Sequence, residues 1–313
     1  MNRDVIKRTE LVGAVLRLGG APMDLTPYAT TGLRIVSVGP SGIGKTNSGL
    51  LIGEQLSAQG WVSVFVDPEG EIAGMYGDPV SSPRELRKLL VGRAKPIIVV
   101  AAKDATEFIP YGQELMQAAD TVRKPMFVLL DEGQLVSAGS KRSNDIGEAS
   151  DLVNNMAQRG RKRALDLFMT AHRFTGSLHR SIFANANLKL IGAQEDPTAW
   201  STLAPQFRGS NIEFADLAAL APGEFFCFSR RGVEKIRMKM ADALCKVAPK
   251  AVAGRRTLPA TFTEWDRAMR AISTERLNAL DDDIVTLMSA VSGLPVQKVL
   301  AGQRALSEEL ETR

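Results

Sequence analysis

The sequence predicts an α/β fold, in which a mostly parallel, doubly wound sheet is followed by a small C-terminal helical region. Short apolar runs alternate with stretches of helical pattern over residues 33–192, the order that parallel strands and right-handed crossover helices produce. One run, residues 125–130, is apolar throughout, as expected of a central strand covered on both faces. A glycine-rich loop, residues 39–44, joins the first apolar run to the first helix.

The expected strands are apolar, β-rich runs that end at glycine, proline or polar residues. Residues 1–30 form a short lead-in, whose apolar segment 11–18 is interpreted as a strand pair or a short helix. A closing hairpin is expected from residues 223–229 and 233–240, because basic and apolar residues alternate after a turn at 230–232. The other strands are expected at 33–38, 61–66, 96–101, 125–130, 166–171 and 188–192.

The expected helices lie between these strands, where polar and apolar residues repeat with a helical period. Gly60 ends the first of them. Residues 137–149 are small and polar, and we expect a flexible loop there. The helices are placed at 46–58, 82–90, 107–119, 150–163, 178–184, 198–203 and 211–219.

The composition changes near residue 246. Residues 246–260 are rich in Ala, Gly, Arg and Pro, which indicates a linker between a core at 31–245 and a helical region at 261–313. The last two predicted helices meet at Gly293-Leu294-Pro295. Such a pair resembles a helix-turn-helix, although most pairs of this kind are simply packed helices.

Length and composition fit one large domain with an appendage, or two small domains. The chain has 313 residues, of which 44% are hydrophobic, with a formal net charge of +4 and a pI near 9.1. No apolar run approaches the roughly 20 residues of a membrane-spanning helix, and residues 1–10 are too polar for a secretory signal. We therefore expect a cytoplasmic protein without a membrane partner.

The numbers and positions of the cysteine, histidine and basic residues indicate which metal sites and charged ligands the chain could bind. Cys227 and Cys245 have neither a CxxC spacing nor a histidine nearby, so we expect free thiols and no zinc site. Two histidines are too few for a histidine-based metal site. Basic residues cluster at 141–142, 159–163 and 230–239. Such clusters can neutralise a phosphate backbone, but a solvated basic face explains them nearly as well.

Residues 39–46 fit the phosphate-binding pattern G-x-x-x-x-G-K-[ST] without a gap. The glycines let the main chain turn tightly and direct its N–H groups at phosphate oxygens, Lys45 adds a positive charge, and the Thr46 hydroxyl can ligate Mg²⁺. The strand before the loop and the helix after it distinguish it from a chance glycine-rich turn. The predicted nucleotide-binding residues here are Gly39, Pro40, Ser41, Gly42, Ile43, Gly44, Lys45, Thr46 and Asn47.

Acidic residues follow two of the predicted strands, at the sheet edge where ligands of α/β folds gather. Asp131 and Glu132 follow the fully apolar run. There a first carboxylate can support Mg²⁺ and a second can polarise the water that attacks a phosphate. Asp67 begins an acidic loop that extends to Glu71. Paired acids are common at surface turns, but after a phosphate loop they indicate hydrolysis, and adjacent acids favour ATP over GTP.

The order of these motifs resembles the HerA/FtsK superfamily of hexameric, DNA-pumping ATPases, and HerA in particular. The resemblance covers residues 10–240 and implies a RecA-like P-loop NTPase core that uses ATP and Mg²⁺. The phosphate loop is shared by many families, whereas the Asp-Pro-x-Gly-Glu and Gly-Arg-Lys segments point to this one. The matching segments are Asp-Pro-Glu-Gly-Glu at 67–71, Leu-Leu-Asp-Glu at 129–132, Arg-Gly-Arg-Lys-Arg at 159–163, Thr-Ala-His-Arg at 170–173 and Asn-Leu-Lys-Leu-Ile-Gly at 187–192.

The resemblance implies a role for each acidic and phosphate-binding residue. Lys45 and Thr46 would bind phosphate and Mg²⁺. Asp131 would support the metal, and Glu132 would be the general base. Asp67, or less readily Glu71, would be the acidic residue that lies close to the nucleotide at the end of the neighbouring strand.

Two further roles and one difference follow from the resemblance. Arg161, or less readily Arg159, would act as an arginine finger in the site of the next subunit; a phosphate or surface contact is the alternative. His172 stands where the family usually has Gln, as a γ-phosphate sensor at the end of the strand beside the hydrolysis strand. Histidine can also bond phosphate, with a pH dependence of its own. The N-terminal β-barrel of HerA proteins has no counterpart before the phosphate loop, so its collar would be absent or supplied by another protein.

These implications predict an ATP-driven motor that moves double-stranded DNA through the centre of a homohexamer. Lys141 and Arg142 follow the hydrolysis strand and are candidates to grip DNA phosphates, although an ordinary surface loop has the same composition. The alternatives are DNA packaging or transfer for a phage or plasmid, protein transport, and a ring scaffold that docks a nuclease or other effector. A small-molecule P-loop kinase is disfavoured, because it would need a lid and a substrate acid site.

Overall fold

The structure is a computed structural model of the chain and describes residues 11–92, 95–122, 125–137, 144–173, 178–194 and 196–246. The chain divides into two compact units, Met1–Ala248 and Pro249–Arg313, and all described residues belong to the first. The predicted linker beyond Lys246 and the predicted C-terminal helices lie outside the described residues.

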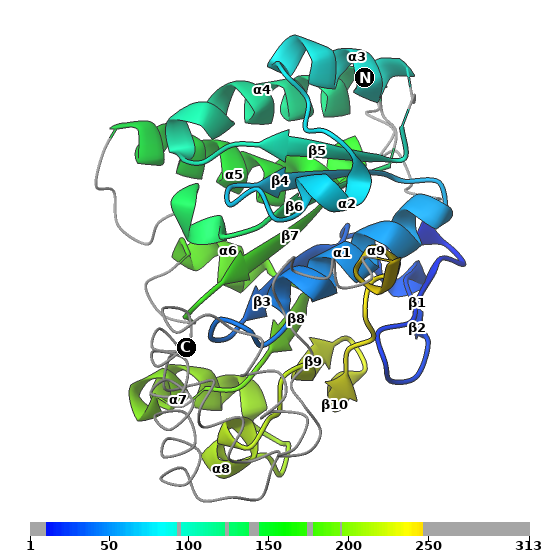
Figure 1. Ribbon diagram of the computed structural model, residues 1–313. Coiled ribbons are helices and arrows are strands. Elements are labelled where there is room, and N and C mark those ends of the chain that lie inside the picture. The colour runs from blue at the N-terminus through cyan, green and yellow to red at the C-terminus, as the bar shows by residue number, and fades with distance from the viewer. Residues whose placement is uncertain are drawn as a thin grey trace, which may run out of the picture. The chain divides into compact units, whose positions relative to one another are not determined.

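The described residues of the first unit form an eight-stranded sheet in the order β10-β9-β8-β3-β7-β6-β4-β5 (Figure 1). The six strands from β8 to β5 are parallel, and β9 and β10 continue the sheet in antiparallel pairing. This confirms the predicted α/β class. The strands are β3 (Arg34–Val38), β4 (Val62–Asp67), β5 (Ile97–Ala101), β6 (Met126–Leu130), β7 (Leu165–Ala171), β8 (Leu188–Ile191), β9 (Glu224–Ser229) and β10 (Gly232–Arg237).

Helices cover both faces of the sheet, because each fully buried strand alternates its side chains between two cores. Ile35 of β3 belongs to the core that includes residues of α1, and its neighbour Val36 belongs to the core that includes residues of α3, α4 and α5. The helices are α1 (Lys45–Ala58), α2 (Ala73–Tyr76), α3 (Pro83–Gly92), α4 (Ala105–Val122), α5 (Asn144–Arg163), α6 (Arg180–Asn185), α7 (Pro197–Leu203), α8 (Phe214–Ala218) and α9 (Asp242–Lys246).

Helix α1 lies unusually close to the sheet through two glycines. A Cβ on Gly49 would lie 2.6 Å from the Leu129 side chain, and one on Gly53 would lie 2.4 Å from that of Phe65. Any larger residue would push α1 away from β6 and β4. Because Thr46 is in the first turn of α1, this close packing also sets how near the Thr46 hydroxyl comes to the end of β6.

Polar side chains of α1 fasten the flanking chain segments to the core. The Gln59 amide accepts from the Val15 N–H at 2.9 Å and donates to the Val15 carbonyl at 3.0 Å, and Gln55 makes the same pair with Arg17. Val15–Leu16 (β1) pairs with Met23–Asp24 (β2), so the lead-in is a strand pair rather than a helix. Of the two interpretations of segment 11–18, the strand pair is therefore the one observed.

The predicted strands agree with the structure to within one or two residues, except at the end of the closing hairpin. Gly232, predicted in the turn, pairs with Ser229 as the first residue of β10. The predicted second strand of the hairpin extended to residue 240, but β10 ends at Arg237. Met240, predicted on the apolar face, is 56% exposed. The short helices α2 and α9 were not predicted, since four or five residues carry no clear period.

The prediction of a flexible loop over residues 137–149 is wrong for its second half. Helix α5 begins at Asn144, six residues before the predicted start. The residues there are polar because they lie on the outer side of a helix packed on α4, where Thr106 donates to Asp145 at 3.0 Å. A buried Ala149 faces the core. Tertiary packing therefore stabilises a helix that composition alone did not indicate.

Within the described part of the chain, no helix is both long and apolar enough to cross a membrane.

Candidate active site

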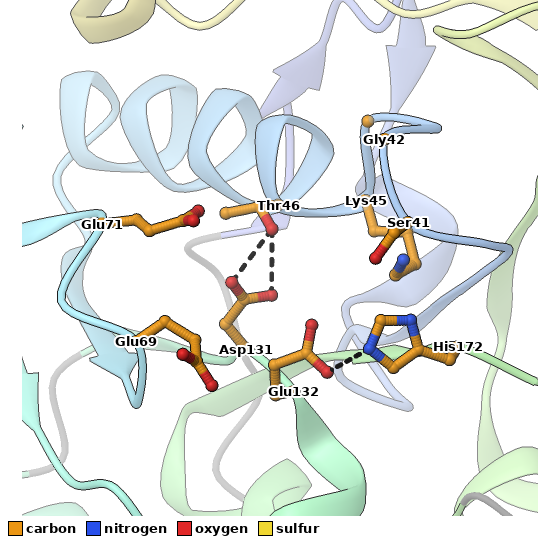
Figure 2. A pocket seen from close by; sticks show the side chains of 10 residues that line it. Ser41, Gly42, Lys45, Thr46, Glu69, Glu71, Asp131, Glu132 and His172 are labelled. Carbon is orange, nitrogen blue, oxygen red and sulfur yellow. Dashed lines mark hydrogen bonds and ion pairs between the residues drawn. The ribbon is translucent and has the colours of Figure 1, made fainter. Parts of the chain in front are cut away.

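The carboxyl ends of β3, β6, β4 and β7 meet around a cavity of about 540 Å³. Figure 2 shows side chains from the phosphate loop on one side of it and from the turns after β6 and β7 on the other. This is the sheet edge at which α/β folds bind ligands. The lining residues are Ser41, Gly42, Gly44, Lys45, Thr46, Glu69, Glu71, Asp131, Glu132 and His172.

The phosphate loop has the conformation that its glycines permit. Gly42 and Gly44 have φ angles of 79° and 100°, in the left-handed region that side chains disfavour. The buried Lys45 ammonium donates to the Pro40 carbonyl of the same loop at 2.9 Å. Desolvation lowers the pKa of Lys45, although the carboxylates of Glu132 and Asp131 oppose this shift. Lys45 is thus a desolvated cation beside the cavity, to which a phosphate would be a better partner than a carbonyl.

Asp131 is held by two hydroxyl groups. Thr46 Oγ1 donates to the Asp131 carboxylate, at 2.9 Å from Oδ2 and 3.2 Å from Oδ1 (Figure 2), and Thr170 Oγ1 donates to Oδ1 at 2.8 Å. Burial raises the pKa of Asp131, and the two hydroxyl bonds act in the opposite direction. Thr46 and Asp131, which the resemblance assigned to the same metal, are thus hydrogen-bonded to each other.

Glu132 has an unusual backbone conformation, and its carboxylate contacts two neighbouring side chains. Its φ and ψ angles are 48° and 49°, which is rare for a residue other than glycine. Its Oε2 lies 2.6 Å from His172 Nε2 (Figure 2) and also accepts from Gln134 Nε2. His172 follows β7, the strand that pairs with β6, as the resemblance implied. One histidine side chain thus contacts the candidate general base directly.

Asp67 ends β4, the strand beside β6, as expected, but its side chain does not line the cavity. It is buried, and its two oxygens accept N–H groups from Gly70, Glu71, Ile72 and Ala73 at 2.7 to 3.2 Å. Those four bonds fix the loop after β4. The carboxylates that this loop presents to the cavity are those of Glu69 and Glu71. The sequence could not distinguish these acids, because all three stand within five residues.

Other predicted nucleotide-binding residues shape the loop without lining the cavity. Ile43 is buried in the core, and its carbonyl accepts from the Gly223 N–H at 2.9 Å. The Asn47 side chain donates to the Lys239 carbonyl and accepts from the Ala241 N–H, both at 2.9 Å. Asn47 therefore anchors the segment after β10.

The candidate arginine fingers lie at the opposite edge of the sheet. Arg159 is exposed near the end of α5, which leads into the start of β7. Arg161 belongs to the same helical turn. A seven-residue strand separates this edge from the cavity by roughly 20 Å. Neither arginine is therefore near the cavity of its own chain. Lys141 and Arg142 fall outside the described residues.

The sequence analysis missed three residues at the site. Thr170 bonds to Asp131 and to the Glu132 N–H, Gln134 bonds to the Glu132 carboxylate, and Glu69 lines the cavity. Two of them left a usable signal: Thr170 is a lone hydroxyl near the end of a strand that is otherwise apolar except for Asp166, and Glu69 belongs to the acidic loop after β4.

The side-chain oxygen atoms at the cavity are suitable ligands for a hard divalent cation that would also bind phosphate oxygens. The Thr46 hydroxyl and one Asp131 carboxylate meet beside the phosphate loop, and Mg²⁺ prefers such oxygens. Among the described residues, no group of three or more His, Cys, Asp or Glu side chains could hold a metal by itself. A metal at this site would thus take its remaining ligands from nucleotide and water.

Known structures confirm the fold. The genome packaging NTPase B204 of Sulfolobus turreted icosahedral virus 2 matches with a TM-score of 0.51 and 16% identity in complex with AMPPCP, and with 0.52 and 15% in complex with ATP-gammaS. Both matches cover 66% of this chain and 98% of that one. EccC of Thermomonospora curvata (ATPases 2 and 3) matches with a TM-score of 0.50 and 13% identity over 75% of this chain and 42% of that one.

The likeness to these solved structures shows a shared α/β fold of the P-loop NTPase type, with mostly parallel strands and flanking helices. No protein-family profile matches the sequence, and no curated protein sequence does.

Proposed function

We propose that this chain is the ATP-hydrolysing subunit of a ring motor, a homohexamer that moves double-stranded DNA through its channel. The observation that carries the proposal is the meeting of Thr46, Asp131 and Glu132 at one cavity beside a phosphate loop. This arrangement supplies the groups that ATP hydrolysis requires: an anion cradle, oxygens for a metal, and a carboxylate base.

Each group has a distinct task. Main-chain N–H groups of the loop and the Lys45 ammonium bind the phosphates, and Lys45 leaves the Pro40 carbonyl to do so. Thr46 and Asp131 would hold Mg²⁺, which when bound neutralises charge on the phosphate oxygens. Glu132 accepts a proton from the attacking water, for which its carboxylate must be released from His172 and Gln134. His172 can then bond the γ-phosphate instead.

A ring is supported by the place of the two arginines. Arg159 and Arg161 lie near the amino edge of the sheet, remote from the cavity of their own chain. An arginine at that edge can contribute to hydrolysis only at another subunit's cavity, where it would offset charge on the transferred phosphoryl group. Contacts of this kind couple hydrolysis to relative motion of subunits.

DNA as the polymer is supported by the fold and by the charge of the chain. The known structures that share this fold include a genome packaging NTPase, and the net charge of the chain is +4. Lys141 and Arg142 stand about ten residues after the hydrolysis strand, on the segment that begins with Asp131 and Glu132, so DNA contacts there would respond to the nucleotide state. The fold likeness also supports the HerA/FtsK superfamily, with DNA packaging as a function within it.

The proposal is tested by ATP turnover with and without duplex DNA. We expect turnover to rise severalfold with DNA. Glu132→Gln should abolish turnover, whereas Glu148→Gln, at an exposed residue of α5, should leave it unchanged. Turnover that ignores DNA would favour the ring scaffold, and a protein that hydrolyses no ATP would contradict the proposal. Mass measurement with an ATP analogue and DNA tests the hexamer, and a monomer under all conditions would exclude it.

Mixed rings test the arginine finger. Lys45→Ala and Arg161→Ala subunits are each expected to be inactive alone. When mixed, an interface between an intact Lys45 and an intact Arg161 forms in part of the rings, so turnover should reappear. Mixtures that stay inactive, while Arg159→Ala mixtures recover, would assign the finger to Arg159 instead.

A further inference from the structure

Thr170 is a fully buried hydroxyl beside the candidate site but outside the lining of its cavity. It lies on β7, where its neighbour Met169 pairs with Leu130, so it stands next to the turn that carries Asp131 and Glu132. A valine would have the same shape there without the cost of burying a hydroxyl group. A polar residue at this point therefore needs an explanation in its bonds.

The Thr170 hydroxyl makes two bonds that join the two acids. Oγ1 donates to Asp131 Oδ1 at 2.8 Å and accepts from the Glu132 N–H, also at 2.8 Å. A hydroxyl has one proton to donate, so its donor capacity is used on Asp131. One oxygen atom thus fixes the carboxylate of the metal-side acid relative to the main chain of the candidate base.

Both bonds matter more when the site is filled. The left-handed backbone of Glu132 is unfavourable for a residue that carries a side chain, and its N–H donates to Thr170. The other hydroxyl on Asp131 belongs to Thr46, which would turn towards a metal. Thr170 then remains as the hydroxyl that holds the Asp131 carboxylate in place.

We propose that Thr170 is a positioning residue, which aligns Asp131 for the metal and Glu132 for the water at the same time. The inference rests on the proposed ATP hydrolysis. Thr170 is fully buried and does not line the cavity, so it acts through the two acids. Its hydroxyl, not its methyl group, is the part that matters.

The test compares Thr170→Val, which removes the hydroxyl, with Thr170→Ser, which keeps it. Affinity for ATP-gammaS is measured with Mg²⁺ and with EDTA, alongside kcat and KM for ATP. In Thr170→Val we expect the gain in affinity from Mg²⁺ and the value of kcat to fall by about 10- to 100-fold. Affinity in EDTA should stay the same, and Thr170→Ser should recover both quantities.

Ser63→Ala is the matched control. Ser63 is also a buried hydroxyl of the sheet, bonded to the Gly53 carbonyl at 2.9 Å, but it lies away from both acids. The Ser63→Ala substitution should lower the melting temperature without changing the Mg²⁺ effect, the gain in ATP-gammaS affinity that Mg²⁺ provides. If Thr170→Val does not fold, Thr170→Ala, which leaves room for a water molecule, takes its place.

Two results would overturn the proposal. One is a Thr170→Val protein with an unchanged Mg²⁺ effect, and the other is a folded Thr170→Ser protein as impaired as Thr170→Val. The affinity measurement needs no turnover. If the wild-type protein hydrolyses no ATP, the proposed function fails, while the Mg²⁺ effect still decides the role of Thr170.

Discussion

The two edges of the parallel sheet bury an aspartate in different ways. At the carboxyl edge, Asp131 accepts from the hydroxyls of Thr46 and Thr170. At the amino edge, Asp166 accepts from the Leu33 N–H at 2.7 Å and from the indole N–H of Trp61 at 2.9 Å. A hydroxyl can rotate its proton towards another acceptor, whereas main-chain and ring N–H groups are fixed. The hydrogen bonds of Asp131 can therefore rearrange around a ligand, whereas those of Asp166 hold chain segments of the fold together.

Asp67 shows that the type of donor, and not the edge alone, decides the role. It stands at the carboxyl edge, yet all its described bonds come from main-chain N–H groups of the loop after β4. Its partners cannot be withdrawn without unfolding that loop. By this criterion Asp67 is held like Asp166, and the proximity to the nucleotide that the resemblance implied for Asp67 stays a prediction.

The largest effect is expected at Lys45, the desolvated cation of the carboxyl edge. Lys45→Ala should lower ATP turnover by at least about 100-fold, because the phosphates lose their fixed positive partner. Assembly should persist. Lys103→Ala, at an exposed lysine after β5, is the control and should leave turnover unchanged. A Lys45→Ala protein with normal turnover would mean that the cavity is not the catalytic site.

The comparison of the two aspartates is tested by making the same substitution in each. Asp166→Asn keeps one acceptor for two fixed donors, so we expect unfolding free energy to fall by about 1–3 kcal/mol while turnover of the folded protein is retained.

Asp131→Asn should do the opposite. Its hydroxyl partners can reorient around an amide, so stability is kept, but turnover should be lost with the metal-side carboxylate. Denaturant unfolding and ATPase measurements on both variants decide the matter. Loss of stability in Asp131→Asn together with loss of activity in Asp166→Asn would reverse the comparison.

The smallest effect is a pH dependence of stability from Asp131. Burial raises its pKa above 3.8, the value of an unperturbed aspartate. The folded protein therefore binds this proton more tightly than the unfolded chain, and the stabilisation is full below the unfolded pKa and lost as pH rises through the folded pKa. The side-chain amide in the Asp131→Asn variant does not titrate in this range, so that variant lacks the effect.

The measurement is thermal unfolding without Mg²⁺ from neutral pH down to about pH 4. Wild-type protein should gain stability relative to Asp131→Asn as the pH falls. A difference between the two proteins that stays constant over this range would contradict the raised pKa.

Local patterns in the sequence were sufficient to predict the fold class, the phosphate loop and the two acids that follow β6. The phosphate loop is encoded by neighbouring residues, since Gly42 and Gly44 permit φ angles that Lys45 and Thr46 depend on. The strands could be predicted because a buried strand must be apolar along its whole length. Asp131 and Glu132 could be placed because they follow such a strand without an intervening residue.

Only the tertiary structure decided which polar groups meet. Thr170 is 39 residues from Asp131 in the chain, and their contact depends on the pairing of β7 with β6. The same pairing brings His172 to the Glu132 carboxylate. The start of α5 at Asn144 depends on its packing against α4, which no local period in residues 144–149 revealed.

The sequence by itself thus determined that a phosphate-binding loop and a pair of acids share one sheet edge, because both are set by the ends of individual strands. The structure decided that Asp131 is held by rotatable hydroxyls, and Asp67 and Asp166 by fixed N–H groups. Hydrogen-bond partners far apart in the chain are chosen by strand order and by the closeness of packing, and neither can be read from neighbouring residues.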